Sequence, residues 1–363
     1  MPRDLAASRP LESATGQDAP PEPGRRDVRA ASPSPRAARR RGTGLAWSER
    51  FGLPVLGLAM VVGFSVALPD TFASAANWRA IATSSSVLAV AAMALMMPLI
   101  AGRFDISVGS NIGATSIACA AVMSKTELPS VAAVLVAVVI GLAVGLVNGL
   151  LVAYVGVNSI IATLGISIVL DGLVQAYTAG TPISSHLSRR LTDLSTNVWF
   201  GVPALFVLML LVAVAFGTFL NRTRFGRYTI ATGVNETAAR LNGLNTRRVV
   251  LGAFVVTGGL SSLAGVGQVA AQGNGNPQVG SITFILPALA AVFLGATTWR
   301  PGTYNVPGTV LGLFFVGIAV SGLAILGVPP WVTTVFNGTA VVVAVALSAV
   351  LRRQRTGVAA LGT

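Results

Sequence analysis

Ten long apolar stretches, separated by short polar segments, run from residue 52 to residue 351 and constrain the fold more than any other feature. A helix needs about 20 mainly apolar residues to cross the hydrocarbon core of a bilayer, and most of the stretches come close to that length. Only 10% of the residues are charged, against about 25% in ordinary soluble domains, so the composition fits lipid as the solvent. The sequence therefore predicts an all-α fold, a polytopic transmembrane helical bundle of about ten spans.

The predicted spans cover about residues 52–68, 81–101, 106–123, 130–153, 159–178, 200–220, 249–271, 283–298, 307–327 and 332–351. Gly, Asn or Pro residues near the starts of the third and ninth spans make these two the candidates for broken or re-entrant helices. Polar groups exposed by a break are tolerated at membrane depth only inside protein or beside water, so such a segment would lie within the bundle.

The formal net charge of +13 is concentrated in the two tails and in one loop, residues 221–248. With an even number of spans, the segments on one side sum to +13 and those on the other to +1, and Asp171 lies inside a span. Basic residues favour the cytoplasmic side of a membrane. We therefore expect a multi-pass protein of the bacterial plasma (inner) membrane, with the 221–248 loop and both termini in the cytoplasm.

Three regions follow from this pattern. Residues 1–50 are rich in Pro, Ala, Ser and Arg and predict a disordered basic cytoplasmic tail. Residues 51–351 form the predicted transmembrane domain, and residues 352–363 a short cytoplasmic tail.

Several classes of function are excluded by what the sequence lacks. Lys125 is its only lysine and follows Met-Ser, so the chain contains no phosphate-binding loop and is not expected to be an enzyme that hydrolyses ATP. His186 is the only histidine and Cys119 the only cysteine, so neither a metal site nor a disulfide framework is expected. No cofactor is implied. The basic residues lack interleaved aromatics, which argues against nucleic-acid binding.

Polar residues within or beside the spans are candidates for a solute pathway, because unpaired polar groups are costly in lipid. Hydrogen bonding between helices is the alternative role for each of them. Asp105 lies beside Arg103, so an interfacial ion pair is a further alternative for that residue. No relay of carboxylates is present, which argues against proton-coupled transport but leaves sodium coupling open. The candidate pathway residues are Asp105, Ser107, Asn111, Asn148, Asn158, Thr163, Asn274 and Gln278.

Four stretches resemble the permeases of ribose-type ABC importers, the inner-membrane components of binding-protein-dependent sugar transport. Residues 101–110 (AGRFDISVGS) are similar to the family's Gly-Gly-Ile-Asp-Leu-Ser-Val-Gly-Ser. Residues 145–153 with 161–165 match its Asn-Gly and Ile-Ala-Thr-Leu-Gly elements. The most specific similarity covers residues 223–245, and the last covers 288–297 with 307–312. The order is that of the family, over roughly residues 80–350.

This resemblance implies a permease that passes a monosaccharide-like solute inward by alternating access, driven by a separate ATPase. The implied partners are an ABC ATPase subunit, an extracellular or periplasmic solute-binding protein, a second permease copy and membrane lipid. It also implies that a short helix in the basic loop docks into the ATPase. The residues that carry this docking motif are Asn235, Glu236, Ala238, Ala239, Arg240 and Gly243.

Some positions depart from the family pattern. Arg103 stands where glycine is usual, Pro287 where aspartate is expected, and residues 300–305 replace a glycine-rich turn. These departures lie in the membrane region, so coupling to an ATPase is better supported than ribose as the solute. An ABC permease for nucleosides or branched-chain amino acids, or a secondary transporter without an ATPase, are the alternative functions.

Overall fold

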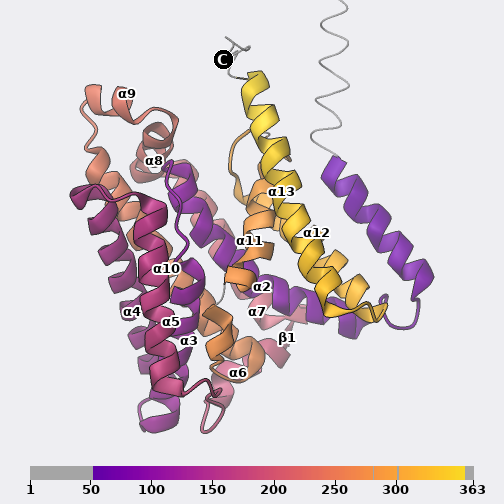
Figure 1. Cartoon of the computed structure of the whole chain (residues 1–363). Coiled ribbons are helices and arrows are strands. Elements are labelled where there is room, and N and C mark those ends of the chain that lie inside the picture. The colour runs from indigo at the N-terminus through magenta and orange to yellow at the C-terminus, as the bar shows by residue number, and fades with distance from the viewer. Residues whose placement is uncertain (1–51, 281, 301, 356–363) are drawn as a thin grey trace, which may run out of the picture. The chain divides into compact units, whose positions relative to one another are not determined.

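The computed structural model describes residues 52–280, 282–300 and 302–355, and these ranges are almost entirely helical (Figure 1). Each of the ten predicted spans coincides with one helix. These helices are residues 52–67, α2 (Ala75–Ile100), α3 (Val108–Lys125), α4 (Ser130–Leu150, continued by the π-helical turn η1, Leu151–Val155), α5 (Ser159–Thr178), α7 (Ala204–Arg222), α10 (Thr246–Gln272), α11 (Ile282–Gly295), α12 (Val306–Ile325) and α13 (Pro330–Arg355).

Shorter elements connect the long helices. They are α6 (Arg189–Thr196), β1 (Val198–Trp199), β2 (Val202–Pro203), α8 (Arg224–Val234), α9 (Glu236–Leu241) and the 3-10 turn η2 (Pro277–Gly280). β1 and β2 pair antiparallel. The predicted N-terminal tail, residues 1–50, lies outside the described residues. Of the predicted C-terminal tail, residues 352–355 belong to α13, and residues 356–363 lie outside the described residues.

Six described helices are long and apolar enough to cross a membrane: α2, α4 with η1, α5, α7, α10 and α12. Three shorter apolar stretches, residues 52–67, 283–295 and 330–346, match the first, eighth and tenth predicted spans. The helical polytopic bundle is thereby confirmed, and the number of spans is supported in outline. α3 matches the third predicted span but is not apolar enough to count among the six long helices. Ile112, Cys119 and Ala120 show that much of it is buried inside the bundle.

The two helices expected to be broken are continuous, and the irregular backbone lies before them or elsewhere. Asn305 caps α12 by accepting a hydrogen bond from the Gly308 N–H at 2.8 Å. A loop instead precedes α11, where residues 273–280 run alongside α3. Gly275 packs against Ala120 near the end of α3, and Gly280 packs against Gly113 nearer its start. The chain therefore turns back into the bundle before α11 begins.

α10 forms the centre of the bundle and packs against α4, α2 and α3. Its contact with α4 is backbone to backbone, because glycines line both helices. A Cβ at Gly141 would lie 2.6 Å from Gly258 O, and a Cβ at Gly145 would overlap Phe254 O. Larger side chains at these positions would force the helices apart, as overpacking does in any close-packed interior.

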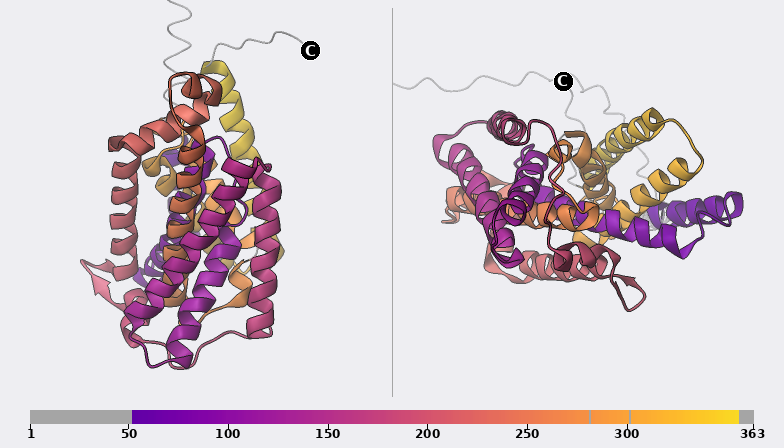
Figure 2. Two further views of the ribbon diagram at one scale, coloured as in Figure 1. Left: turned by 90° about the vertical axis from the view of Figure 1, so that its left-hand side faces the viewer. Right: turned by 90° about the horizontal axis from the view of Figure 1, so that it is seen from below.

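The connecting segments gather at two opposite ends of the bundle. α8 and α9 lie at one end, together with the C-terminal end of α13, whereas α6 and β1 lie toward the other (Figure 1). The side view in Figure 2 shows the same separation, with the paired strands far from the α8–α9 loop. We refer to these as the α9 end and the α6 end.

Candidate functional site

The linker between α2 and α3, residues 101–107, is not helical, so its backbone N–H groups need other acceptors. α5 supplies two of them from its first turns. The N–H of Phe104 donates to Ser159 Oγ at 3.2 Å, and the N–H of Ile106 donates to Thr163 Oγ1 at 3.0 Å. These bonds fix the linker against α5 just before α3 begins.

Asp105 in this linker is buried and is the acceptor for Ser107. Its Oδ1 accepts hydrogen bonds from the Ser107 N–H at 2.9 Å and from Ser107 Oγ at 2.6 Å. Burial raises the pKa of Asp105 to about 6, and the two hydrogen bonds from Ser107 oppose that rise. The positive end of the α3 dipole lies next to the carboxyl and favours its ionised form.

Asn148 of α4 completes this arrangement. Its Nδ2 donates to Ser107 Oγ at 2.7 Å, so the Ser107 hydroxyl accepts from the amide and donates to the carboxylate. We call Asp105, Ser107, Asn148 and Thr163 the α3 cluster. All four were predicted as pathway residues, and the structure brings them together from α4, α5 and the linker into α3.

Two amide oxygens near the α3 cluster are buried and have no hydrogen-bond partner among the described residues. They are Oδ1 of Asn148 and Oδ1 of Asn111, which lies one helical turn after Ser107. An unsatisfied buried acceptor costs about 1–3 kcal/mol, so both oxygens would gain from a ligand that donates hydrogen bonds. The site therefore presents a carboxylate and two free acceptors within one buried region.

A polar cavity of about 570 Å³ adjoins the linker at the α9 end. Asn158, another predicted pathway residue, lines this cavity and also caps α5, where its Oδ1 accepts from the Ile160 N–H at 2.9 Å. Arg103 and Tyr304 line it from the other sides. The cavity places Asn158 next to the linker that carries Asp105, although no hydrogen bond joins the two residues.

Asn274 and Gln278 lie apart from the α3 cluster, in the loop that precedes α11. Asn274 donates to Gln272 O at 3.3 Å, and Gln278 is exposed. The eight predicted pathway residues therefore fall into separate groups.

Two serines that the sequence reasoning missed connect α3 with α5 and with this loop. Ser110 Oγ lies 2.6 Å from Ser167 Oγ and donates to Gly280 O at 3.3 Å. Ser110 lies one turn after Ser107, and Ser167 lies one turn after Thr163, on the same helix faces. This spacing is the sequence signal that could have identified them.

The short helix expected in the basic loop is present as α9. Asn235 caps it by accepting a hydrogen bond from the Ala238 N–H at 2.9 Å, and Gly243 follows it with a φ of +81°. Glycine adopts this left-handed conformation without steric cost, which is why helices commonly end there. Local sequence signals thus define both ends of α9.

Glu236 connects α9 to the α2–α3 linker. Its carboxylate pairs with Arg103 at 2.7 Å and with Arg240 at 3.1 Å, and it accepts a hydrogen bond from Thr246 Oγ1 at 3.2 Å. The sequence suggested Asp105 as a partner for Arg103, and this suggestion is wrong because Arg103 pairs with Glu236, 133 residues away. Because Arg103 lies only two residues before Asp105, this ion pair connects α9 to the part of the linker that carries Asp105.

Ala239, one of the predicted docking residues, is buried within this chain. Ala239 is only 6% exposed, because α9 packs its face against α8 and α10 of the same chain. The neighbouring positions point outward instead: Ala238 and Arg240 are exposed, Val234 is 82% exposed and Leu241 84%. The accessible face of α9 therefore contains Ala238, Arg240 and Leu241, and Val234, the last residue of α8, is exposed as well.

Backbone contact joins α8 to the same linker. A Cβ at Gly233 would overlap Ile100 O and lie 3.1 Å from the Gly102 N–H nitrogen, so the last turn of α8 rests directly on the start of the linker. Residues 101–107 therefore touch α8 and α9 at one end and supply Asp105 and Ser107 to the α3 cluster at the other.

Comparison with known proteins identifies relatives over most of the chain. A family model described as "Branched-chain amino acid transport system / permease component" matches residues 77–351. The ribose import permease protein of Escherichia coli (strain K12) is 31% identical over 297 residues, which cover 80% of this chain and 91% of that protein. No solved structure matches the chain.

Two further relatives give the same picture. The L-arabinose transport system permease protein of Escherichia coli (strain K12) is 30% identical over 302 residues, 83% of this chain and 90% of its own length. The autoinducer 2 import system permease protein of Photorhabdus temperata is 27% identical over 310 residues, which cover 83% of this chain and 91% of that protein. The matched region contains the α3 cluster, the linker and α9, and the protein therefore belongs to the family of transport-system permease components that the model describes.

Proposed function

We propose that this protein is the transmembrane subunit of an ABC importer that passes a monosaccharide-like solute inward by alternating access. The observation that carries the proposal is similarity over about four fifths of the chain to permeases named for ribose, arabinose and autoinducer 2 import. A separate ATPase would supply the energy, and a binding protein outside the membrane would deliver the solute to a pair of permeases.

The α3 cluster favours a polyhydroxylated solute over a branched-chain amino acid. Sugar hydroxyls donate hydrogen bonds, and Asp105, Asn111 and Asn148 offer acceptors in one buried region. A branched-chain amino acid would require a cation for its carboxylate and an apolar pocket for its side chain. Arg103 is the cation nearest in the sequence, and its guanidinium pairs with Glu236. A nucleoside would share the ribose hydroxyls, so transport measurements must separate these two.

Reconstitution tests the proposal. Genes next to the one for this chain are the place to find an ATPase with a phosphate-binding loop and a secreted binding protein. Liposomes that contain the permease and ATPase, with binding protein on one side, should take up labelled pentoses only with ATP. Ribose, a nucleoside and leucine should be compared in parallel. Uptake by the permease alone would favour a secondary transporter and would contradict the proposal.

The route from α9 to the α3 cluster gives a specific prediction for Arg103. Arg103→Glu should place two carboxylates together and loosen α9 from the linker, lowering the maximal uptake rate several-fold with little change in the solute concentration at half-maximal rate. Each side chain is about one third exposed, so the change in folding stability should be small, within about 1 kcal/mol.

The charge-swapped double variant Arg103→Glu with Glu236→Arg is the control, because it restores an opposite-charge pair between the same positions. It should recover most of the uptake rate that either single variant loses. Equal losses in the double and single variants would show that the pair does not link α9 to the linker.

Topology supplies a further prediction. We infer that the α9 end and both termini face the cytoplasm, because the basic loop at residues 221–248 lies at the α9 end. Ser185 near α6 and Thr237 in α9 are both exposed, and Cys119 is buried. In a Cys119→Ala background, Ser185→Cys should react with an impermeant thiol reagent on intact cells, and Thr237→Cys should react only after lysis. The reverse pattern would invert the proposed orientation.

A further inference from the structure

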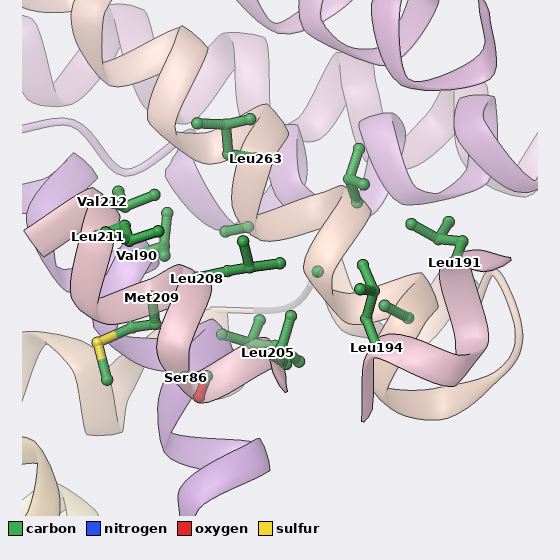
Figure 3. Close-up of a pocket in the computed structure, with 15 residues that line it drawn as sticks. Ser86, Val90, Leu191, Leu194, Leu205, Leu208, Met209, Leu211, Val212 and Leu263 are labelled. Carbon is green, nitrogen blue, oxygen red and sulfur yellow. The ribbon is translucent and has the colours of Figure 1, made fainter. Parts of the chain in front are cut away.

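An apolar cavity of about 280 Å³ lies between α2, α7 and α10, with α6 at one end (Figure 3). No residue of the α3 cluster lines it. Leu205, Leu208 and Met209 line it from α7, and Leu191 and Leu194 from α6. The volume is close to the lower limit of about 300 Å³ that is typical of small-molecule sites. It suits a single slender apolar group.

The cavity opens sideways between two predicted spans. α7 and α10 meet over only a small area, and α2 closes the space behind them. Leu211 of α7 is 60% exposed and Leu263 of α10 is 41% exposed, and both flank the cavity. Exposed leucines on apolar helices of this length contact hydrocarbon, so the opening faces the lipid.

The chemistry of the cavity excludes a sugar. Ser86 is its only polar lining side chain, and the Ser86 hydroxyl already donates to Ala82 O at 2.6 Å. A polyol placed here would lose its hydrogen bonds to water without replacement, which is costly. An acyl chain would bury apolar surface without that loss.

Positive charge lies beside one end of the cavity. Arg189 and Arg190 occupy the first turn of α6, directly before the lining residue Leu191, and both are exposed. Neither makes an ion pair with any residue in the described ranges. Cations in a first helical turn oppose the helix dipole, so these arginines do not stabilise α6. They also lie at the end where the positive-inside bias disfavours basic residues.

We propose that this cavity binds an anionic phospholipid, with one acyl chain between α7 and α10 and the headgroup phosphate on Arg189 and Arg190. A phosphate here would pair with both guanidinium groups and would face the N-terminus of α6, where Ser188 provides no side-chain cap. The proposal depends only on the membrane location of the bundle and not on which solute the protein transports.

Lipid retention by the full-length protein tests this proposal. The protein would be purified in a non-ionic detergent and titrated with phosphatidylglycerol or phosphatidylcholine that carry the same acyl chains, and bound lipids would be counted by native mass spectrometry. Glycerol phosphate, which has the headgroup charge but no acyl chain, forms the third arm. We expect phosphatidylglycerol to bind about tenfold more tightly than phosphatidylcholine, and glycerol phosphate to bind negligibly.

Two variants test the two parts of the proposed lipid site, the arginines and the apolar cavity. Arg189→Ala with Arg190→Ala should reduce phosphatidylglycerol binding to the level of phosphatidylcholine. Leu208→Trp should fill the cavity and weaken binding of both lipids. Lys125→Ala is the matched control, because it removes an exposed positive charge at the α6 end away from the cavity and should leave binding unchanged.

Three results would overturn the proposal. The first is equal binding of the two lipids to the unaltered protein. The second is binding of glycerol phosphate as tight as that of phosphatidylglycerol, which would indicate a free-phosphate site. The third is a Leu208→Trp variant that keeps its lipids but loses self-association, which would show that this face contacts a second copy of the chain. If the Leu208→Trp variant misfolds, the arginine variants and the comparison of the two lipids still test the proposal.

Discussion

Leu241→Asp should nearly abolish ATP-driven uptake while the protein remains folded in the membrane. Leu241 is the most exposed apolar residue of α9. We propose that α9 docks into the ATPase, and this docking would bury Leu241. An aspartate there would carry an unpaired charge into the interface, and burying even an uncharged polar group without a hydrogen-bond partner costs about 1–3 kcal/mol. We therefore expect about a thirtyfold loss of ATPase binding.

The matched control is Leu241→Met, which keeps the apolar surface and most of the volume and should retain uptake. Co-purification of the ATPase and ATP hydrolysis in response to loaded binding protein are the measurements. Ala239→Trp is less informative, because Ala239 is buried against α8 and α10 and the change would disturb α9 itself. Wild-type co-purification with Leu241→Asp would show that α9 does not dock through this face.

The second large effect is expected in the α3 cluster. Asp105→Asn removes a buried charge that accepts two hydrogen bonds from Ser107, and Asn148→Leu removes both the donor to Ser107 and a free acceptor. Hydrogen bonds to charged groups contribute about 1.5–3 kcal/mol, so Asp105→Asn should lower uptake at limiting solute by about tenfold or more.

A loss of solute contacts should raise the half-saturating concentration, which separates these variants from the Arg103 variant, where the maximal rate falls. Thr257→Val is the control, because Thr257 is equally buried and hydrogen bonds to Ala94 O at 3.1 Å in another part of the bundle. Normal uptake by both Asp105→Asn and Asn148→Leu would show that the α3 cluster only packs the helices together.

The sequence predicted the helices well because their signals are local. Hydropathy over a window of about 20 residues identifies an apolar helix without knowledge of its neighbours. The signals for the two ends of α9 were also local, because Asn235 caps the first turn and Gly243 adopts a left-handed conformation after the last turn. The four-residue spacing of Gly145 and Gly149 on α4 is also a local signal, and both residues approach the backbone of α10 closely.

What the sequence could not predict depends on contacts between distant segments. An ion pair between Arg103 and Asp105 was one alternative that the sequence offered, whereas Arg103 pairs with Glu236, which is distant in the sequence. Ala239 matched a docking motif, but packing against α8 and α10 decides which face of α9 is exposed. Apolar helices precede and follow the loop before α11 in the sequence. Hydropathy therefore did not indicate that this loop turns back along α3.

The glycine contact between α4 and α10 also determines which parts of the molecule can move during transport. Peptide groups that touch at Gly141 and Gly258 leave no room for rotation, so these two helices must move as one rigid body. Asn148 attaches the α3 cluster to that body. α7 meets α10 over a small area beside the apolar cavity. A change in the distance between α7 and α10 would therefore leave the geometry of the α3 cluster intact, and a lipid bound between these helices would resist that movement.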